Sequence, residues 1–382
     1  MAIARTQDDP VAPPRARPAG PRGVARSLRA AARTTVFFLK VMPMVPSRPI
    51  DWVTPAPRVE RVRYPTPGGE AVGDLYRPPT PGPHPGVVVC LGVVPFGADH
   101  PQVPRLGAAL ARAGFAALLH WSPAMRDLRL DPEDVLGIAL AYRWLIEHPF
   151  VDPTRSGLLG TCVGSSFALM AAADPEIRDR VSFVSAWAPY ASIWTLARDV
   201  TSATTTSTGG STPTPWPVDP LTRRVYVRSL TATLAPAEAE WLRNACAERT
   251  GGVDPDKLSA EGRAVYPLLT ALDACAAEAA LARLPLTLRQ RLDAISPTTY
   301  LSGIRAPLIV VAHDRGDTVI PIEESRRLVS ALAGRGRVRF TEFLMFKHLD
   351  PTTVRLPLPV LARELVKFVR FVYPIFRQAT RP

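Results

Sequence analysis

The chain has 382 residues, 47% of them hydrophobic, and it carries a formal net charge of +12. Only four of the 46 basic residues are Lys, and about half of the excess charge lies in the first 40 residues. The rest of the sequence has no basic stripe with interleaved aromatic side chains, so it does not predict a groove that binds nucleic acid. The four cysteines are far apart and have no histidine at ligand spacing, which excludes a disulfide framework and a zinc site and favours a reducing cytoplasm. No apolar run approaches the roughly 20 residues that cross a bilayer, and we expect no secretory signal because no small-residue cleavage site follows the first apolar run.

Residues 1–50 are expected to form a basic tail followed by an amphipathic segment. Up to about residue 24 the chain consists mostly of Pro, Arg and Ala, which cannot bury enough apolar surface to offset chain entropy, so we expect disorder there. Residues 24–46 place Phe37, Phe38 and other apolar side chains among basic ones. This segment either docks on the body of the protein or makes a peripheral contact with a membrane surface, and we favour docking.

The body alternates between strand and helix patterns over residues 51–190 and again over residues 301–382. Such alternation predicts one mostly parallel sheet with helices on both faces, opened by an antiparallel pair at residues 58–64 and 71–76. Further strands are predicted at residues 86–92, 115–121, 156–160, 181–186, 307–312 and 338–344. Helices are predicted at residues 105–113, 131–147, 163–173, 323–333 and 360–373.

The alternation fails over residues 191–300. A stretch rich in Thr and Ser, residues 201–214, is followed by helical patterns at residues 235–248, 260–272 and 275–284 with no strand between them. This block is predicted to be a helical cap inserted into the sheet domain.

The strongest chemical signal is the turn Gly160-Thr161-Cys162-Val163-Gly164, between a predicted strand and a predicted helix. A nucleophile at such a sharp turn requires small residues two positions before and after it, because the two backbones approach closely there. The start of the helix favours a thiolate at Cys162, and the amide of Val163 points to where an oxyanion would form. The alternative is an inert cysteine at the end of a buried strand.

An acid and a histidine must follow in that order, each in the loop after its own strand. Asp317, four residues before Pro321, is the preferred acid, and Asp314 at the end of its strand is a lesser candidate that could serve as a turn former. His348 follows the next strand and is the only histidine after Asp317. We therefore predict a triad of Cys162, Asp317 and His348.

The second oxyanion donor is expected in the Gly-rich loop at residues 91–97, where we select the amide of Val93. Ser165 and Ser166 are rival nucleophiles, but Ser165 has bulky neighbours two positions away and Ser166 falls about one turn into the helix. The remaining histidines are expected in lesser roles, and three of them, at strand ends or in the loop after Gly97, could reach the rim of the site. The five remaining histidines are His84, His100, His120, His148 and His313.

With these residues in place, the chain resembles the α/β-hydrolase superfamily, and within it the dienelactone-hydrolase-like group. The resemblance covers residues 57–190 and 305–375 and rests on the loop after residue 90, the turn around Cys162, Asp317, and the run that ends in His348. It implies the α/β-hydrolase fold, class α/β, here with an inserted helical cap. Members of this group use Cys or Ser, Asp and His to cleave esters or lactones through an acyl-enzyme.

Two departures from that group bear on the prediction. Dienelactone hydrolases carry a Glu in the loop where this chain has Leu91-Gly92, and they lack a long cap. Polyester synthases and some acyl-CoA-dependent acyltransferases are similar to this chain in placing long insertions between a G-x-C-x-G nucleophile and the acid, which are 155 residues apart here. Against that second likeness, the chain lacks their Gly-His turn, and Lys347 precedes His348.

The sequence therefore predicts a cytoplasmic hydrolase of a small-molecule carboxylic ester, lactone or thioester, with an acyl-enzyme on Cys162. An acyltransferase with the same triad is the alternative, and a non-catalytic binding module is the second. No cofactor, metal or nucleic-acid partner is expected, and the oligomeric state is left open.

Overall fold

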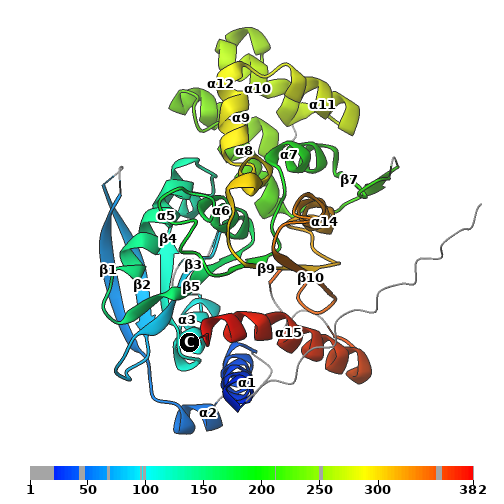
Figure 1. Cartoon of the computed structure of the whole chain (residues 1–382). Helices are drawn as coiled ribbons and strands as arrows, with labels where there is room; N and C mark the ends of the chain where they lie inside the picture. Colours follow the sequence, from blue (N-terminus) through cyan, green and yellow to red (C-terminus); the bar gives the residue numbers. More distant parts are fainter. Residues whose placement is uncertain are drawn as a thin grey trace, which may run out of the picture.

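The computed structural model describes residues 21–42, 48–66, 69–94, 97, 100–210, 212–248, 253–349 and 355–381. Its centre is an eight-stranded sheet in the order β1-β2-β4-β3-β5-β6-β9-β10 (Figure 1). The strands are β1 (Arg58–Thr66), β2 (Gly69–Arg77), β3 (His84–Cys90), β4 (Ala116–Trp121), β5 (Val151–Thr161), β6 (Val184–Trp187), β9 (Leu308–Asp314) and β10 (Arg337–Phe343). The pairs β1–β2 and β2–β4 are antiparallel and the other pairs parallel, so the predicted mostly parallel sheet with an antiparallel opening is confirmed.

Helices cover both faces of the sheet because successive strand residues point to opposite sides. On β3, Val87 and Val89 belong to one apolar core, and Val88 and Cys90 to the other. The first core packs against α3 (Gln102–Arg112) and α15 (Leu358–Ala379); the second packs against α5 (Glu133–Ile146), α6 (Val163–Ala171) and α14 (Ile322–Ala331). The short elements α2 (Arg48–Val53), α4 (Pro123–Arg126), α13 (Pro297–Tyr300) and η2 (Leu301–Gly303) complete the body.

The basic segment near the N-terminus forms α1 (Pro21–Val41), which packs against α3 and α15 on one face of the sheet (Figure 1). Its Ala30, Thr34 and Phe37 are buried, and the Phe37 ring lies 5.6 Å from that of Phe376 in α15. The apolar side of this helix is thus used within the protein, as the favoured docking prediction requires. The tail of residues 1–20 lies outside the described residues, and peripheral membrane contact stays a prediction.

The inserted block forms a layer of helices beyond the carboxyl ends of the strands (Figure 1). Its elements are α7 (Ile193–Ser202), β7 (Thr204–Thr206), β8 (Pro213–Pro215), α8 (Pro220–Leu230), α9 (Pro236–Glu248), η1 (Pro255–Lys257), α10 (Ala260–Thr270), α11 (Ala274–Ala282) and α12 (Leu286–Ala294). Three of these helices, α9 to α11, coincide with the helical patterns of the sequence. The sequence did not predict α7, α8, α12 or the β7–β8 hairpin.

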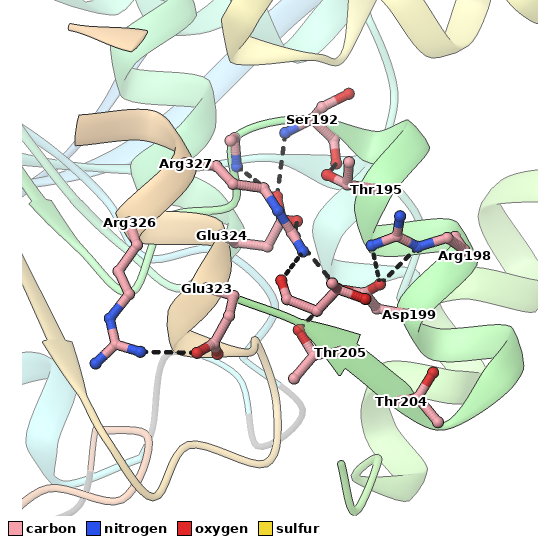
Figure 2. A network of polar contacts seen from close by, with 12 residues as sticks. Ser192, Thr195, Arg198, Asp199, Thr204, Thr205, Glu323, Glu324, Arg326 and Arg327 are labelled. Carbon is pink, nitrogen blue, oxygen red and sulfur yellow. Dashed lines mark hydrogen bonds and ion pairs between the residues drawn. The ribbon is translucent and has the colours of Figure 1, made fainter. Parts of the chain in front are cut away.

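A buried polar network joins the start of this cap to the core (Figure 2). Glu324 of α14, fully buried, accepts hydrogen bonds from the Ala191 and Ser192 amides at 2.8 and 3.2 Å. Arg327, one turn later, pairs with Glu324 and also with Asp199 of α7, at 3.3 Å. Because Glu324 and Arg327 belong to the core and Asp199 to the cap, the network fixes the position of α7 relative to α14.

Candidate active site

Cys162 lies in the turn between β5 and α6, with backbone angles φ 53° and ψ −141°. A residue other than Gly rarely adopts a positive φ, and such strain persists only where surrounding structure enforces it. The Cys162 amide donates to the Trp187 carbonyl at 2.9 Å, which ties the turn to β6. The residue is 6% exposed and lines two cavities.

The glycines around this turn are required by close backbone contacts. A Cβ on Gly160 would lie 2.2 Å from the Cα of Ser165, and one on Gly164 would lie 2.4 Å from the Cys90 carbonyl oxygen. Gly92, at φ +75°, would place a Cβ 2.8 Å from the Thr161 carbonyl oxygen. The local sequence therefore folds as a sharp elbow because larger residues would push the strand and helix apart.

Asp317 lies in the loop after β9, and its side chain is fully buried. Its Oδ1 accepts hydrogen bonds from the Val319 and Ile320 amides at 2.7 and 3.0 Å, and its Oδ2 lies 2.7 Å from Nδ1 of His348. Burial acts to raise the pKa of this carboxyl, but the nearby charge of His348 and hydrogen bonds from two histidines outweigh it and hold the pKa well below its usual range. Asp317 is thus an ionised carboxylate with a fixed orientation.

His348 follows β10 and lies between Asp317 and Cys162. Its side chain is 20% exposed, and Lys347 before it has a positive φ of 49°, which turns the backbone at this point. Burial lowers the pKa of His348, but the charge of Asp317 and the charge and hydrogen bond of Cys162 raise it well above the ordinary value. With Nδ1 held by Asp317, the other ring nitrogen is available to Cys162. The structure therefore brings the three predicted residues together, in the order Asp317, His348, Cys162.

The lesser candidates have other partners. Asp314 accepts hydrogen bonds from the Gly316 and Phe346 amides at 2.9 and 2.8 Å, so it fastens the two loops that carry Asp317 and His348. The Ser165 hydroxyl donates to the Cys162 carbonyl at 2.5 Å. Ser166 donates to the Tyr190 carbonyl at 3.0 Å and accepts from the Tyr190 amide at 2.9 Å. Both serines thus hold the backbone around the elbow, as their predicted place at the helix start suggests.

Two residues next to Asp317 were not predicted to contact it. His313, the penultimate residue of β9 and fully buried, places its Nε2 3.3 Å from Oδ2 of Asp317 and 2.9 Å from the Ile320 carbonyl oxygen. Trp216, in the cap, donates its indole N–H to the Asp317 carbonyl at 3.0 Å. The sequence did indicate that His313 ends a strand on the correct edge of the sheet, but nothing local marked Trp216.

The remaining histidines are dispersed. His120 is buried on β4, where Nδ1 lies 2.6 Å from the Tyr64 hydroxyl and burial lowers its pKa to about 4, so the expectation that it could reach the rim of the site is wrong. His84 contacts the Thr80 carbonyl at 3.0 Å, and His148 contacts the Trp144 carbonyl at 2.9 Å. His100 lines the larger cavity near Cys162, which places it at the rim.

Apolar cavities meet at Cys162. The larger, of about 340 Å³, lies between the sheet and helices α1, α3 and α15, and Leu91 and His348 line it. The smaller, of about 60 Å³, lies beneath the cap helices α7, α8 and α12. Val93 borders both cavities next to Cys162, and Val163 borders the smaller. A substrate carbonyl at Cys162 would therefore lie among mostly apolar side chains.

The two residues predicted to supply oxyanion donors, Val163 and Val93, line the smaller cavity together with Cys162. Val163 is the first residue of α6, where amides have no acceptor within the helix, so its N–H is free to bind an anion. Val93 is held next to the elbow because the adjacent Gly92 touches Thr161 and Gly164. Pro95 and Phe96 of the same loop lie outside the described residues. The roles of the Val163 and Val93 amides as oxyanion donors stay predictions.

Among solved structures, the chain is similar to the 2,6-dihydroxy-pseudo-oxynicotine hydrolase, with a TM-score of 0.51 and 16% identity over 84% of this chain and 68% of that one. It is also similar to an acylaminoacyl peptidase, with a TM-score of 0.50 and 14% identity over 83% of this chain and 41% of that one. The chain has the α/β-hydrolase fold. At these identities the likeness establishes the fold alone.

Sequence comparisons cover only part of the chain, and no family model matches it. A probable 2-oxo-3-(5-oxofuran-2-ylidene)propanoate lactonase from a Bradyrhizobium species is 34% identical over 133 residues, which is 31% of this chain and 52% of the relative. The bile acid-CoA:amino acid N-acyltransferase of Mus musculus is 29% identical over 139 residues, 35% of this chain and 31% of the relative. The chain thus matches about half the length of one relative and a third of the other.

Metal chemistry has no evident site in the part of the chain that the structure describes. There, no group of three or more His, Cys, Asp or Glu side chains is arranged to hold a metal ion. Across the same residues, no helix is both long and apolar enough to span a membrane.

Proposed function

We propose that this α/β-hydrolase-fold protein cleaves a carboxylic ester, lactone or thioester through a covalent acyl-enzyme on Cys162. The observation that carries the proposal is the chain of contacts from buried Asp317 through His348 to Cys162, at a strained elbow where two apolar cavities meet. The partial likeness to a lactonase supports the same reaction class.

In the proposed reaction, His348 takes the proton of Cys162, and the sulfur forms a bond with the substrate carbonyl carbon. The carbonyl electrons move to oxygen, and the amides of Val163 and Val93 bind that oxyanion. When the carbonyl re-forms, the bond to the leaving group breaks, and His348 gives that group its proton. Water then loses a proton to His348 and attacks the thioester, and the C–S bond breaks to release the acid and return the proton to the thiol.

The surroundings of the site support this division of roles. The Asp317 carboxylate already accepts hydrogen bonds from two backbone amides, so its position is fixed. It can therefore hold the His348 imidazole in one tautomer and stabilise its cation. The mostly apolar walls lower the local dielectric constant, which strengthens the attraction between the developing oxyanion and its donors.

An acyltransferase with the same acyl-enzyme is the second candidate. It is favoured by the partial likeness to the mouse N-acyltransferase and by the apolar surroundings of Cys162, which limit the access of water to the intermediate. In that case an amine or alcohol replaces water in the second half of the reaction.

The test is turnover of a panel of p-nitrophenyl esters and acyl thioesters by wild type, Cys162→Ala and Cys246→Ala. Cys246 is a half-buried thiol in the cap that lines neither cavity, so its variant is the matched control. We expect wild-type activity from Cys246→Ala and loss of turnover in Cys162→Ala. Equal turnover in all three proteins would overturn the proposal. Adding amine and alcohol acceptors and measuring the ratio of acid to transfer product separates hydrolysis from acyl transfer.

A further inference from the structure

The larger cavity is deeper than a small acyl group bound to Cys162 would require. It begins at Cys162 and His348 and continues along the face of the sheet to Phe183, which lies at the level of Gly157 because the Leu158 amide donates to its carbonyl at 3.0 Å. From that level to Thr161 the strand advances four residues, or roughly 13 Å. The cavity therefore runs along most of the depth of the sheet layer.

Its walls are mostly apolar along this length, with a few polar side chains such as Ser185 and Arg105 among them. The sheet contributes residues such as Leu159, α15 contributes Phe368 and Val372, and α1 contributes Phe37. All four belong to the same apolar core or pack against it, so the cavity is a gap within a core that is otherwise closely packed. An apolar gap of this size is lined by side chains that lack contact partners, and an apolar ligand would supply those contacts.

The added helix α1 completes this cavity. It fills the space beside α3 and α15, and Arg105 of α3 donates to the Lys40 and Met42 carbonyls at 2.7 and 2.8 Å, which holds the end of α1 in place. Met42 and Val41, at that end, line the cavity. Without α1 this side of the cavity would be open to water, so the segment converts a surface groove into a channel that has a wall on this side.

We propose that this cavity binds the acyl chain of the substrate, and that the chain is a largely unbranched hydrocarbon of about ten carbons. This rests on the proposed function, because the carbonyl must sit at Cys162. The length follows from the depth of the cavity: an extended chain advances roughly 1.2 Å per backbone atom, so 13 Å holds about eleven atoms. A volume of about 340 Å³ is far above the roughly 10–15 Å³ that one water molecule needs, so the width of the cavity does not limit a chain of that length.

The smaller cavity cannot take the same group. At about 60 Å³ it is much smaller than the larger cavity, so it suits a small part of the substrate near the reacting carbonyl. The acyl chain stays attached to the sulfur between the two half-reactions, whereas the leaving group must depart to admit water or an acceptor. A deep apolar channel therefore fits the acyl chain better than the leaving group.

Ser185 of β6 provides a clean way to shorten the channel. It is fully buried, it lines the cavity opposite Leu159 in register, and its hydroxyl has no hydrogen-bond partner among the described residues. Leu159 precedes Cys162 by three residues, so Ser185 lies roughly 10 Å along the strands from the thiol. Ser185→Leu fills this depth without breaking a hydrogen bond, and Ser185→Ala removes the hydroxyl without filling the space.

The experiment measures kcat/KM for p-nitrophenyl esters from acetate to laurate, below their aggregation limits, with wild type, both Ser185 variants and Cys246→Ala. For wild type we expect kcat/KM to rise about threefold to fourfold with each added methylene up to about ten carbons. This factor corresponds to the free energy of burying one methylene. Ser185→Leu should lower the ratio of kcat/KM for decanoate to that for acetate at least tenfold, and Ser185→Ala should lower this ratio less because it does not fill the space. Cys246→Ala, at a residue that lines neither cavity, should retain the wild-type profile. Val372→Phe narrows the channel from α15 and should act in the same direction if Ser185→Leu does not fold.

Failure of this inference and failure of the proposed function give different results. A wild-type profile that is flat from two to ten carbons, with turnover that still depends on Cys162, overturns the inference and leaves the proposed function intact. Absence of turnover at every length overturns the proposed function. In that case, calorimetric binding of decanamide and butanamide to wild type decides the inference: tighter binding of decanamide by at least a hundredfold supports it, and equal or absent binding overturns it.

Discussion

Asp317 and Glu324 are buried carboxylates seven residues apart in the chain, and their surroundings differ in kind. Asp317 is paired with two histidines and two backbone amides, with His348 between it and the thiol. Glu324 is paired with Arg327 and with backbone amides at the start of the cap (Figure 2). A histidine can take and return a proton near neutral pH, whereas an arginine stays charged. The first cluster is therefore suited to proton transfer and the second to holding the cap on the core.

The largest expected effect is on activity, which should depend on the cluster around Asp317 and not on the cluster around Glu324. Asp317→Asn keeps the volume of the side chain but favours the wrong tautomer of His348 and removes the charge that stabilises its cation, so kcat should fall about 10⁴-fold. Glu324→Gln, the comparison variant, should keep kcat within a few-fold for the folded protein. Steady-state kinetics on one ester substrate measures both. Similar losses in the two variants would contradict the division of roles.

The next effect separates them by stability. Arg327→Ala removes the positive charge that pairs with the buried carboxylates of Glu324 and Asp199. The free energy of unfolding should therefore fall by about 3 kcal/mol. Urea unfolding followed by circular dichroism measures this difference. The activity per folded molecule should change little, because none of these residues lines either cavity at Cys162. A loss below about 1 kcal/mol would show that the network does not hold the cap.

The two carboxyls should also give opposite pH dependences. The pKa of Asp317 is lowered, so its stabilising contribution is complete above its unfolded-state pKa, about 3.9, and is lost as the pH falls through the lower folded-state value. The pKa of Glu324 is raised, mainly by burial, so its contribution is complete below about 4.3 and is lost as the pH rises through the folded-state value.

These signs predict how two variants differ from wild type in urea unfolding across acidic pH. The destabilisation by Asp317→Asn should grow, by about 2 kcal/mol, as the pH rises towards 4 and then stay constant. The destabilisation by Glu324→Gln should shrink as the pH rises above about 4.3. Parallel pH profiles for the two variants would contradict the assignment of opposite shifts.

The smallest effect is expected at Arg326, next to Arg327 but on the exposed side of the helix (Figure 2). Its pairs with Glu323 and Glu342, at 2.7 and 3.0 Å, are partly screened by water because its side chain is 36% exposed. Arg326→Ala should therefore lower the free energy of unfolding by less than 1 kcal/mol. It serves as the matched control for Arg327→Ala, and a loss as large as in that variant would show that burial is not what distinguishes the two.

The elbow and the triad could be predicted from sequence because their signals are local. Gly160 and Gly164 stand where the backbone contacts require them, and Asp317 and His348 follow consecutive strands of the sheet at the edge where parallel strands end. The α8 start at Asp219-Pro220 also carries a local signal, an N-cap side chain before a proline, which the sequence interpretation overlooked.

The cavities could not be predicted, since they depend on how distant segments pack. The larger needs α1 beside α15, and these helices are separated by more than 300 residues. The contacts of His313 and Trp216 with Asp317 likewise depend on tertiary structure, because a histidine in a buried strand and a tryptophan in a cap have no spacing that marks their partner.

The central claim is that Cys162 is the nucleophile, and trapping the acyl-enzyme tests it most directly. Wild type and Cys162→Ala are mixed with p-nitrophenyl decanoate and with p-nitrophenyl acetate, quenched in acid within a single turnover, and digested for mass spectrometry. We expect one acyl group per chain on the peptide that contains Cys162, together with a burst of nitrophenol, and no adduct in the variant. An adduct on Cys90, Cys246 or Cys275, or turnover by wild type with no adduct on Cys162, would contradict the claim.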